Sequence, residues 1–336
     1  MTSVLVIRFS SVGDIILSAP VIKALHLSEP EINIDYLVHE RFSALVRHFD
    51  PPPHSVIPFP PTTKAGQLAA YARNLAARNY DVVIDLHNSL RSKYIRRFFR
   101  SSEVRVYHKP RIKRSLLFYL WINLFSSDFS VIKEYLRYAG FSASDQTDAP
   151  RLAVADSEAE TICQQFGLGN DYMISIPGAA WPQKSWLAGR YSELFSRIFT
   201  QYDGQLVLLG GNQDGICDLI AGNLTSERVV NLKGKTDLDE ALAVLSRGRL
   251  IIGSDTGLVH AGEALGIPAI MMLGPTSRET GARVHHPHSQ ALEVALWCRP
   301  CSQNGKRRCY RKEQYCMTRI AVEDVYKIAS RFYEGN

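Results

Sequence analysis

Short apolar runs alternate with amphipathic segments along most of this 336-residue sequence. The runs have the length of buried strands, and the segments between them repeat apolar residues at helical spacing. We expect strands at 3–9, 32–38, 56–59, 81–86, 171–176, 205–209, 228–232, 250–252 and 269–273, and helices at 14–27, 40–47, 65–78, 157–166, 187–199, 214–224, 238–246, 258–265 and 322–332. Pro20 predicts a bend in the helix at 14–27. Because strands and helices alternate, we predict an α/β fold built from parallel βαβ units with right-handed crossovers.

The length indicates two domains, each large enough to form its own core. The polar stretch 141–170 contains Pro150 and has the composition of a linker followed by a short helix. We therefore expect one Rossmann-like domain at 1–150 and a second at 151–320. The last helix, within 321–336, could cross back to the first domain.

Composition narrows the class of protein. Hydrophobic residues make up 46% of the sequence and the net charge is +6, which suits a globular protein with an anionic partner. No apolar run has membrane-spanning length. The N-terminus lacks the basic segment of a signal peptide, and its apolar stretch 4–7 is cut short by Arg8. We expect a cytoplasmic protein with reduced cysteines.

The stretch 250–275, LIIGSDTGLVHAGEALGIPAIMMLGP, combines a strand, a tight turn, a helix and a second strand. The turn places Asp255, Thr256 and Gly257 at a helix N-terminus on the carboxyl edge of the sheet. Free N–H groups and the helix dipole attract anions to such an edge. Thr256 and His260 are four residues apart and project from one face. We interpret the stretch as a diphosphate site, although an ordinary capped turn with a packed histidine gives the same pattern.

Three further side chains follow predicted strands. Asp14 lies where the first strand turns into the first helix, and it could act as a general base on an acceptor hydroxyl or simply cap the helix. Lys184, in the loop 177–186, could neutralise a leaving phosphate or be an ordinary surface lysine. Asp214 follows the strand at 205–209 and could bind ribose hydroxyls or cap a helix.

Several common motifs are missing from the sequence. Neither GxGxxG after the first strand nor GxxxxGK[ST] is present, which argues against a dehydrogenase and a P-loop enzyme. The DxD pattern at 237–239 resembles a metal-binding motif. It begins a helix instead of following a strand, so capping is the better interpretation.

A basic stretch at 87–114 precedes the apolar and aromatic run 116–125. This combination suits an anionic membrane surface or an anionic glycolipid. A solvated basic helix face followed by a core helix is the alternative. Nucleic acid is a third option, but no binding motif supports it. If the glycolipid interpretation holds, the acceptor would be bound by Arg91, Lys93, Lys109 and Lys113.

Four cysteines gather near the C-terminus with the spacing C-x2-C-x7-C-x6-C: Cys298, Cys301, Cys309 and Cys316. In a reduced compartment such a cluster can hold a structural zinc ion or an iron–sulfur centre. A pair of disulfides, or four unligated thiols, would have the same spacing.

Three segments carry a resemblance to a known family. They are RFSSVGDIILSAPVIKAL at 8–25, PGAAWPQKSW at 177–186 and SDTGLVHAGEALGIPAIMMLGPT at 254–276. Their order and spacing resemble the ADP-heptose:lipopolysaccharide heptosyltransferases, glycosyltransferase family nine. The cysteine cluster also looks like one in some members, especially those resembling heptosyltransferase II.

The resemblance implies a GT-B fold, with two Rossmann-like domains facing across a cleft, and an inverting transfer that needs no metal ion for catalysis. It implies Asp14 as general base and Lys184, with the backbone at Thr256 and Gly257, as diphosphate contacts. Asp255 and His260 would complete the nucleotide-sugar site, and Asp214 would face the ribose. One departure is that Ala179 and Ala180 replace hydroxyl residues found before the lysine in some members.

The function expected from the sequence is therefore transfer of a heptose from ADP-heptose to the lipopolysaccharide inner core. The enzyme would lie peripherally on the inner face of the cytoplasmic membrane and would not bind nucleic acid. Two alternatives stay open at this point: a sugar-nucleotide 2-epimerase on the same architecture, and a non-enzymatic basic protein that binds an anionic surface.

Overall fold

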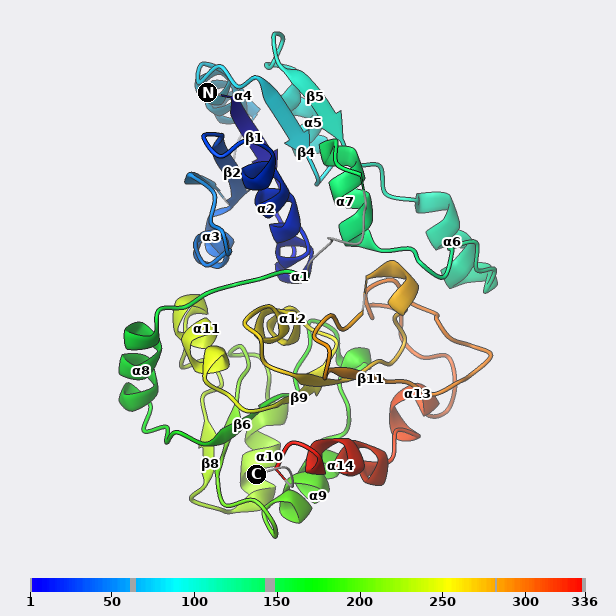
Figure 1. Ribbon diagram of the computed structural model, residues 1–336. Helices are drawn as coiled ribbons and strands as arrows, with labels where there is room; N and C mark the ends of the chain where they lie inside the picture. Colours follow the sequence, from blue (N-terminus) through cyan, green and yellow to red (C-terminus); the bar gives the residue numbers. More distant parts are fainter. Residues whose placement is uncertain (1, 61–64, 143–148, 282, 334–336) are drawn as a thin grey trace. The chain divides into compact units, whose positions relative to one another are not determined.

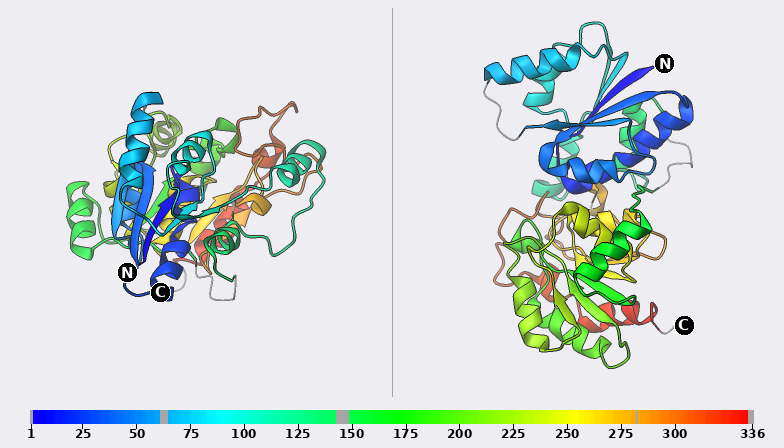
Figure 2. Two further views of the ribbon diagram at one scale, coloured as in Figure 1. Left: turned by 90° about the horizontal axis from the view of Figure 1, so that it is seen from above. Right: turned by 90° about the vertical axis from the view of Figure 1, so that its left-hand side faces the viewer.

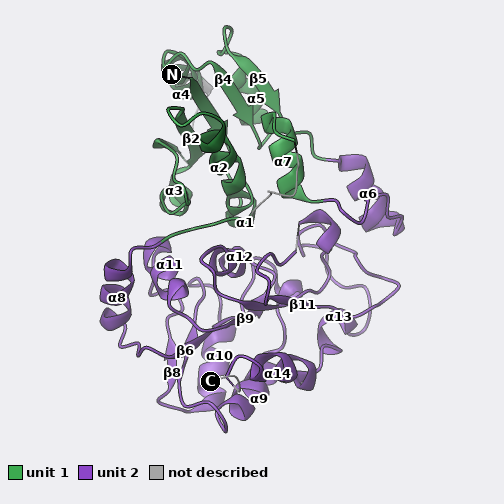
Figure 3. Ribbon diagram, viewed as in Figure 1, with its two compact units in different colours: residues 1–109, 130–153 green, residues 110–129, 154–336 purple. Residues whose placement is uncertain are grey.

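The computed structural model describes residues 2–60, 65–142, 149–281 and 283–333. The chain forms two compact units (Figure 3). Unit 1 comprises residues 1–109 and 130–153, and unit 2 comprises residues 110–129 and 154–336. Segment 110–129 thus belongs with the C-terminal unit, although the sequence places it inside an N-terminal domain at 1–150.

Unit 1 contains a parallel five-stranded sheet in the order β3-β2-β1-β4-β5 (Figure 1). Helices α4 and α5 pack on one face over a core that includes Leu5, Ile7 and Val83, and α2 and α7 lie on the other face (Figure 2). The elements are β1 (Ser3–Ile7), α1 (Val12–Ile16), α2 (Ala19–Ser28), β2 (Asn33–His39), η1 (Glu40–Phe42), α3 (Ser43–Arg47), β3 (Ser55–Phe59), α4 (Ala65–Ala76), β4 (Val82–Asp85), α5 (Leu90–Arg96), β5 (Glu103–Val106) and α7 (Val131–Ala139).

Unit 2 contains a parallel six-stranded sheet in the order β11-β10-β9-β6-β7-β8. Helices α9, α10 and α14 cover one face, while α8, α11 and α12 lie on the other (Figure 1). The elements are α6 (Arg111–Leu120), α8 (Asp156–Gln165), β6 (Tyr172–Ile176), η2 (Pro182–Lys184), α9 (Ala188–Ile198), β7 (Gln205–Leu208), α10 (Ile216–Leu224), β8 (Val229–Asn231), α11 (Leu238–Ser246), β9 (Ile251–Ser254), α12 (Gly257–Ala264), β10 (Ala269–Met272), η3 (Arg278–Thr280), β11 (Gln290–Leu292), α13 (Tyr315–Thr318) and α14 (Val322–Ser330).

Three local expectations from the sequence need correction. The helix expected at 14–27, with a bend at Pro20, is two separate helices: the chain breaks at Leu17 and Ser18, and Pro20 lies in the first turn of α2. The basic stretch 87–114 contains α5 and β5, which its charge pattern conceals. The last helix, α14, packs against α9 and β10 within unit 2, whereas the sequence left open a return to the first domain.

The DxD pattern at 237–239 caps a helix, as expected. The Asp237 carboxylate accepts a hydrogen bond of 2.8 Å from the Glu240 N–H, and Glu240 accepts one of 2.9 Å from the Asp237 N–H. This reciprocal pair is a capping box at the start of α11. None of the helices in the described part of the chain is long and apolar enough to cross a membrane.

Candidate active site

The strand order of unit 2 explains where its candidate residues lie. The chain runs outward from β6 through β7 to β8 and then returns to place β9 on the other side of β6. Loops that leave the carboxyl ends of β6 and β9 therefore diverge at this switch point, which is where α/β sheets bind ligands. The loop after β6 carries Lys184, and the turn after β9 carries Asp255. The Ser254 hydroxyl ties the two together by donating to the Pro177 carbonyl, 3.0 Å away.

Asp255 is the centre of a buried polar cluster. Its Oδ2 atom lies 2.8 Å from the Lys184 ammonium and accepts a 2.7 Å hydrogen bond from the Thr276 hydroxyl. Thr276 follows β10, the neighbour of β9, so three adjacent strands contribute to the cluster. Burial alone raises the pKa of Asp255, but His260 and Lys184 outweigh it and hold that pKa well below its usual value. The carboxylate is therefore ionised and orients the lysine.

His260 lies between two buried carboxylates. Its Nε2 atom is 3.9 Å from Asp255 Oδ1, and its Nδ1 atom is 3.7 Å from Glu263 Oε2, so both interactions are ionic contacts longer than hydrogen bonds. Burial lowers the pKa of His260, yet the two carboxylates outweigh burial and raise it to about 9. Glu263 is held in turn by the backbone N–H groups of His285 and His286, at 2.9 and 3.1 Å. His260 is consequently an imidazolium at neutral pH.

The N-terminus of α12 lies next to this cluster and is partly exposed to solvent. Thr256 is the N-cap residue, in extended conformation, and Thr256 and Gly257 are partly exposed while Asp255 and His260 are buried. The stem of Lys184 packs against Gly305, where an added Cβ would lie only 2.5 Å from Lys184 Cγ. Gly305 has a φ of +84°, so this close approach and its backbone both require glycine. The helix N-terminus and two cationic side chains thus share one edge of the sheet.

Asp214 has a role within its own loop. Its Oδ2 accepts a 2.7 Å hydrogen bond from the Gly211 N–H. The side chain also lies against the backbone of Gly178, where an added Cβ would be 2.4 Å from Asp214 Cγ. Gly215, not Asp214, is the N-cap of α10. Asp214 therefore joins the loops after β6 and β7. Its side chain is half-buried, and β7 is the neighbour of β6, whose loop carries Lys184.

In unit 1, Asp14 lies at the equivalent position, after the strand at the switch point between β1 and β4. Its Oδ2 is 2.6 Å from the guanidinium of Arg8 and 3.2 Å from the Ser11 hydroxyl that donates to it. Arg8 is buried and also donates to the Leu86 carbonyl, 2.5 Å away, at the end of β4. A buried arginine thus joins the two central strands and fixes the carboxylate.

The charges around Asp14 set its protonation state. Partial burial raises the pKa of Asp14, but Arg8, Lys109 and Ser11 outweigh it and lower the pKa to about 2. The Asp14 side chain keeps 33% of its surface exposed. Burial together with Arg8 and Lys109 lowers the pKa of His87, just after β4, to about 4. At neutral pH Asp14 is therefore an ionised, partly exposed carboxylate, and His87 is a neutral imidazole.

The four basic residues expected to hold an acceptor do not all belong to one unit. Arg91 and Lys93 are exposed on α5, and Lys109 is exposed at the end of the first segment of unit 1. Lys113 is exposed on α6, which belongs to unit 2.

The four C-terminal cysteines are free thiols. Burial, and to a smaller extent the neighbouring thiols Cys316, Cys298 and Cys309, raise the pKa of Cys301 to about 11. Among the described residues, however, no group of three or more His, Cys, Asp or Glu side chains is arranged to hold a metal ion. The backbone N–H groups of Cys301 and Ser302 bond to the Pro275 carbonyl at 3.0 and 3.1 Å, which joins this loop to the end of β10. A metal at the cysteines stays a prediction.

A pocket of about 700 Å³ lies beyond the ends of β10 and β11. It is lined by Thr276, Arg278, Glu293 and Trp297, among others. Glu293 pairs with Arg278 and, at 3.0 Å, with Arg299. Because Thr276 also binds Asp255, the pocket adjoins the buried cluster. Its size is that of a small-molecule site.

Comparison with known proteins identifies the family. The sequence profile of glycosyltransferase family 9 (heptosyltransferase) matches residues 68–311, which is more than half of the chain. The chain belongs to glycosyltransferase family 9. This family 9 protein is 26% identical over 301 residues to lipopolysaccharide heptosyltransferase 2 of Escherichia coli K12, covering 84% of this chain and 86% of that protein.

Solved structures agree on the fold. The transferase matches the E. coli ADP-heptose lps heptosyltransferase II with a TM-score of 0.80 at 22% identity, covering 100% of this chain and 99% of the other. It matches the E. coli heptosyltransferase WaaC with ADP with a TM-score of 0.68 at 19% identity, covering 98% and 100%. The family resemblance and the GT-B class of fold are confirmed. The protein is a glycosyltransferase, so neither the epimerase nor the non-enzymatic alternative holds.

The sequence analysis missed four residues that interact with the candidate site residues. Arg8 and His87 lie around Asp14 in unit 1, and Glu263 and Thr276 belong to the buried cluster around Asp255 in unit 2. Arg8 had a signal, since it is a charge within the apolar strand expected at 3–9. Glu263 also had one, because it is three residues from His260 on a helix. Thr276 and His87 reach their groups only through strand pairing, which spacing along the chain does not reveal.

Proposed function

We propose that this family 9 transferase moves a heptose from ADP-heptose to the inner core of lipopolysaccharide, with inversion at the anomeric carbon. The support from homology is that the relatives it matches are named lipopolysaccharide heptosyltransferases, and one matched structure is a complex with ADP. The observation that carries the proposal is the buried cluster of Asp255, Lys184 and His260 at the start of α12.

The cluster suits a leaving diphosphate. A lysine ammonium has three N–H donors, so Lys184 can keep its contact with Asp255 and still donate to a phosphate. His260 brings a second positive charge, and the N–H groups at Thr256 and Gly257 bring the positive end of the α12 dipole. Asp255, being anionic, acts by positioning Lys184 and His260. These charges would stabilise the diphosphate as it departs, without a catalytic metal ion or a general acid.

Asp214 would face the ribose of the donor. Its Oδ2 is occupied by the Gly211 N–H, which leaves the other carboxylate oxygen for a hydroxyl. The half-buried side chain lies next to the loop that carries Lys184, as a nucleoside attached to the diphosphate would require.

Asp14 would accept the proton of the acceptor hydroxyl. The hydroxyl oxygen forms a bond to the anomeric carbon as the bond from that carbon to the diphosphate oxygen breaks, and ADP leaves with the bonding electrons. A carboxylate with a pKa of about 2 is a weak base. It is nevertheless ionised at every physiological pH, and it can take the proton late, when the new C–O bond has made that proton acidic.

Arg91, Lys93, Lys109 and Lys113 would bind the phosphate and carboxylate groups of the inner core. All four are exposed, as contacts to a large anionic acceptor require. Because that acceptor is attached to a lipid, we further propose that the enzyme works peripherally on the inner face of the cytoplasmic membrane.

A donor screen with a truncated lipopolysaccharide core tests the function. We expect transfer from ADP-heptose and production of one ADP per transferred sugar, with little or no transfer from UDP- or GDP-sugars. The product linkage should have the anomeric configuration opposite to that of the donor, as read by NMR. A donor-only reaction that changes the sugar without an acceptor would contradict the proposal, as would equal use of donors with other bases.

A further inference from the structure

An unusual set of side chains is exposed on unit 2. Most of the exposed large hydrophobic side chains in the described part of the chain come from two segments, 111–124 and 297–312. They include Ile112 at 78% exposed, Tyr119 at 63% and Trp297 at 67%. The others are Leu120, Trp121, Ile122, Leu124 and Tyr310. Scattered single residues of this kind are ordinary, but a concentration of them indicates an interaction site.

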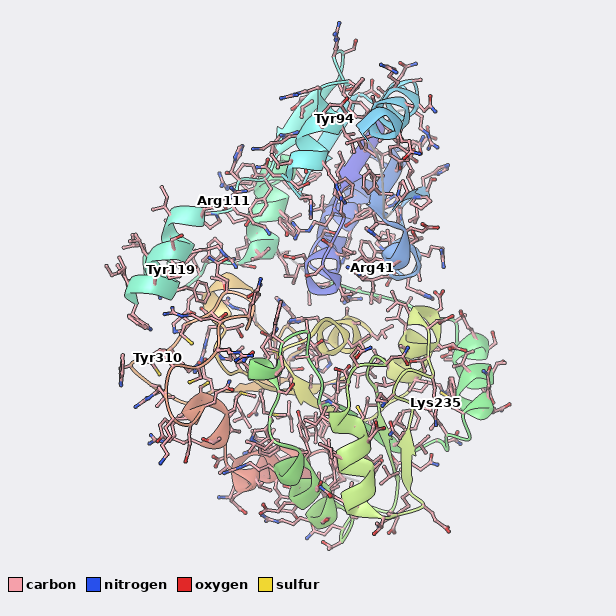
Figure 4. All side chains as sticks on the ribbon, turned by 180° about the vertical axis from the view of Figure 1, so that it is seen from behind. Arg41, Tyr94, Arg111, Tyr119, Lys235 and Tyr310 are labelled. Carbon is pink, nitrogen blue, oxygen red and sulfur yellow. The ribbon has the colours of Figure 1, made fainter. Side chains whose placement is uncertain are left out.

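Direct contacts join the two segments into one surface, which we call the aromatic-basic surface. The rings of Trp121 and Trp297 have centroids 6.0 Å apart, and those of Trp297 and Tyr310 are 6.3 Å apart. The Arg307 guanidinium lies 5.9 Å from the ring centroid of Tyr119. Figure 4 shows Tyr119 and Tyr310 on the same side of unit 2, with Lys235 on the opposite side. Segments almost 200 residues apart in the sequence therefore present their aromatic rings together.

Helix α6 has apolar side chains on both its buried side and its exposed side. Leu117 and Phe118 are buried against Phe125, whereas Tyr119 and Leu120 are exposed. The Arg114 guanidinium donates to the Thr280 carbonyl, 3.3 Å away, and so holds the helix on unit 2. A helix that needed only to fold would expose polar residues on its outer side. The outer side of α6 instead exposes Ile112, Tyr119 and Leu120 beside the basic residues Arg111 and Lys113.

The charge of the surface selects its partner. Segments 111–124 and 297–312 contain nine lysine and arginine residues and no aspartate or glutamate. Arg111, Lys306, Arg307 and Lys312 are exposed among the apolar side chains. Aromatic and aliphatic side chains surrounded by lysine and arginine match the interface of an anionic bilayer, where rings enter the headgroup layer and cations meet phosphates. A second copy of the same surface would instead bring like charges together.

We propose that the aromatic-basic surface docks unit 2 on an anionic membrane, with the exposed side chains of α6 and Trp297 inserted at the headgroup level. Trp297 also lines the pocket beyond β10 and β11, so docking would bring that pocket to the bilayer surface. The inference rests on exposure and charge, and it does not require the proposed donor or acceptor to be correct.

Cosedimentation with vesicles tests the docking. The probe is phosphatidylcholine vesicles with and without phosphatidylglycerol, using the full-length protein without donor or acceptor. We expect binding to the anionic vesicles that weakens as salt is added. The Tyr119→Ser/Leu120→Ser variant should lose about tenfold or more in partitioning. The Arg307→Glu/Lys312→Glu variant should lose at least about 30-fold.

Two control variants test whether the loss of vesicle binding is specific to the aromatic-basic surface. Leu27→Ser/Leu219→Ser removes two equally exposed leucines, and Lys235→Glu/Arg331→Glu reverses two exposed charges, all outside the surface. Both controls should bind vesicles like the wild type. All variants should transfer sugar normally to a lipid-free soluble acceptor, which separates docking from chemistry.

Equal vesicle binding by surface and control variants would overturn the proposal. So would tight binding to purely zwitterionic vesicles that salt does not affect. A dimer that dissociates when Tyr119 and Leu120 are replaced, seen by sedimentation velocity, would show that a second copy covers the surface instead. Failure of transfer by the wild type with every donor would refute the proposed function and leave the docking result standing.

Discussion

Replacing His260 should change how the stability of unit 2 depends on pH. The environment of this buried histidine raises its pKa from 6.5 to about 9, because Asp255 and Glu263 favour the charged ring more than burial disfavours it. A shift of this size corresponds to about 3 kcal/mol of stabilisation. Since the pKa is raised on folding, this stabilisation is fully present below about pH 6 and is lost as the pH rises through 9. His260→Gln keeps the ring's approximate size and hydrogen-bonding capacity but cannot become charged.

Tryptophan fluorescence provides a local assay. The four tryptophans of the sequence, Trp121, Trp181, Trp186 and Trp297, all belong to unit 2, as does His260. Urea unfolding followed by this signal at pH 6 and pH 9.5 therefore reports the relevant unit. The free energy of unfolding of the wild type should fall between the two pH values by about 3 kcal/mol more than that of His260→Gln.

Other groups that titrate between pH 6 and pH 9.5 affect wild type and His260→Gln alike. Comparing the pH dependence of the free energy of unfolding of the two proteins therefore isolates the contribution of His260. Identical pH dependence in wild type and His260→Gln would refute the reasoning, because it would mean that the ring is not charged in the folded protein. Glu263→Gln is an intermediate case and should remove only part of the difference, since Asp255 remains.

Other substitutions test the remaining groups. Arg8→Met should destabilise unit 1 by about 2–4 kcal/mol in thermal melts followed by circular dichroism, because it leaves the Leu86 carbonyl and the partly exposed Asp14 without their buried partner. The same change should raise the pKa of Asp14 towards 3.8 and shift the acidic limb of the pH–rate profile upward, and an unmoved limb would contradict the role of Arg8. Lys184→Met should lower kcat about 10²–10³-fold, while Lys327→Met, an exposed lysine on α14, should not; equal effects would argue against a contact with the leaving group. If the four cysteines hold a metal, elemental analysis of protein purified without chelator should find about one zinc, or iron with sulfide, per chain, and a Cys301→Ser/Cys316→Ser variant should not retain it. Protein without stoichiometric metal would end that interpretation.

The alternation of strands and helices predicts the fold well, and its failures have physical causes. Strand β5 was missed because its sequence, Glu103–Val106, alternates charged and apolar residues at a sheet edge within a basic stretch. Segment 110–129 follows unit 1 in sequence but packs with unit 2, a choice made by tertiary contacts such as Trp121 on Trp297. No local pattern encodes that choice.

The site could be predicted only where its residues are close in sequence. Asp255, Thr256 and His260 are recognisable from the strand, turn and helix that carry them. The partners that set their charge come from elsewhere, since Thr276 arrives through the pairing of β10 with β9. The sequence likewise predicts that Asp14 lies near the start of a helix, and Asp14 is in the first turn of α1. The sequence does not show that a buried Arg8, fixed by the Leu86 carbonyl of another strand, lowers the pKa of Asp14 to about 2.

We propose that unit 2 holds the leaving diphosphate while Asp14 of unit 1 takes the proton. The most direct measurement compares Asp14→Asn with wild type in transfer from ADP-heptose to a soluble truncated core, alongside ADP binding by calorimetry. Asp81→Asn, an exposed carboxylate that accepts from the Ser3 N–H at 2.8 Å, serves as control. We expect Asp14→Asn to lose about 10²–10⁴-fold in kcat with unchanged ADP affinity, and Asp81→Asn to transfer normally. Near-normal transfer by a folded Asp14→Asn variant would contradict the claim.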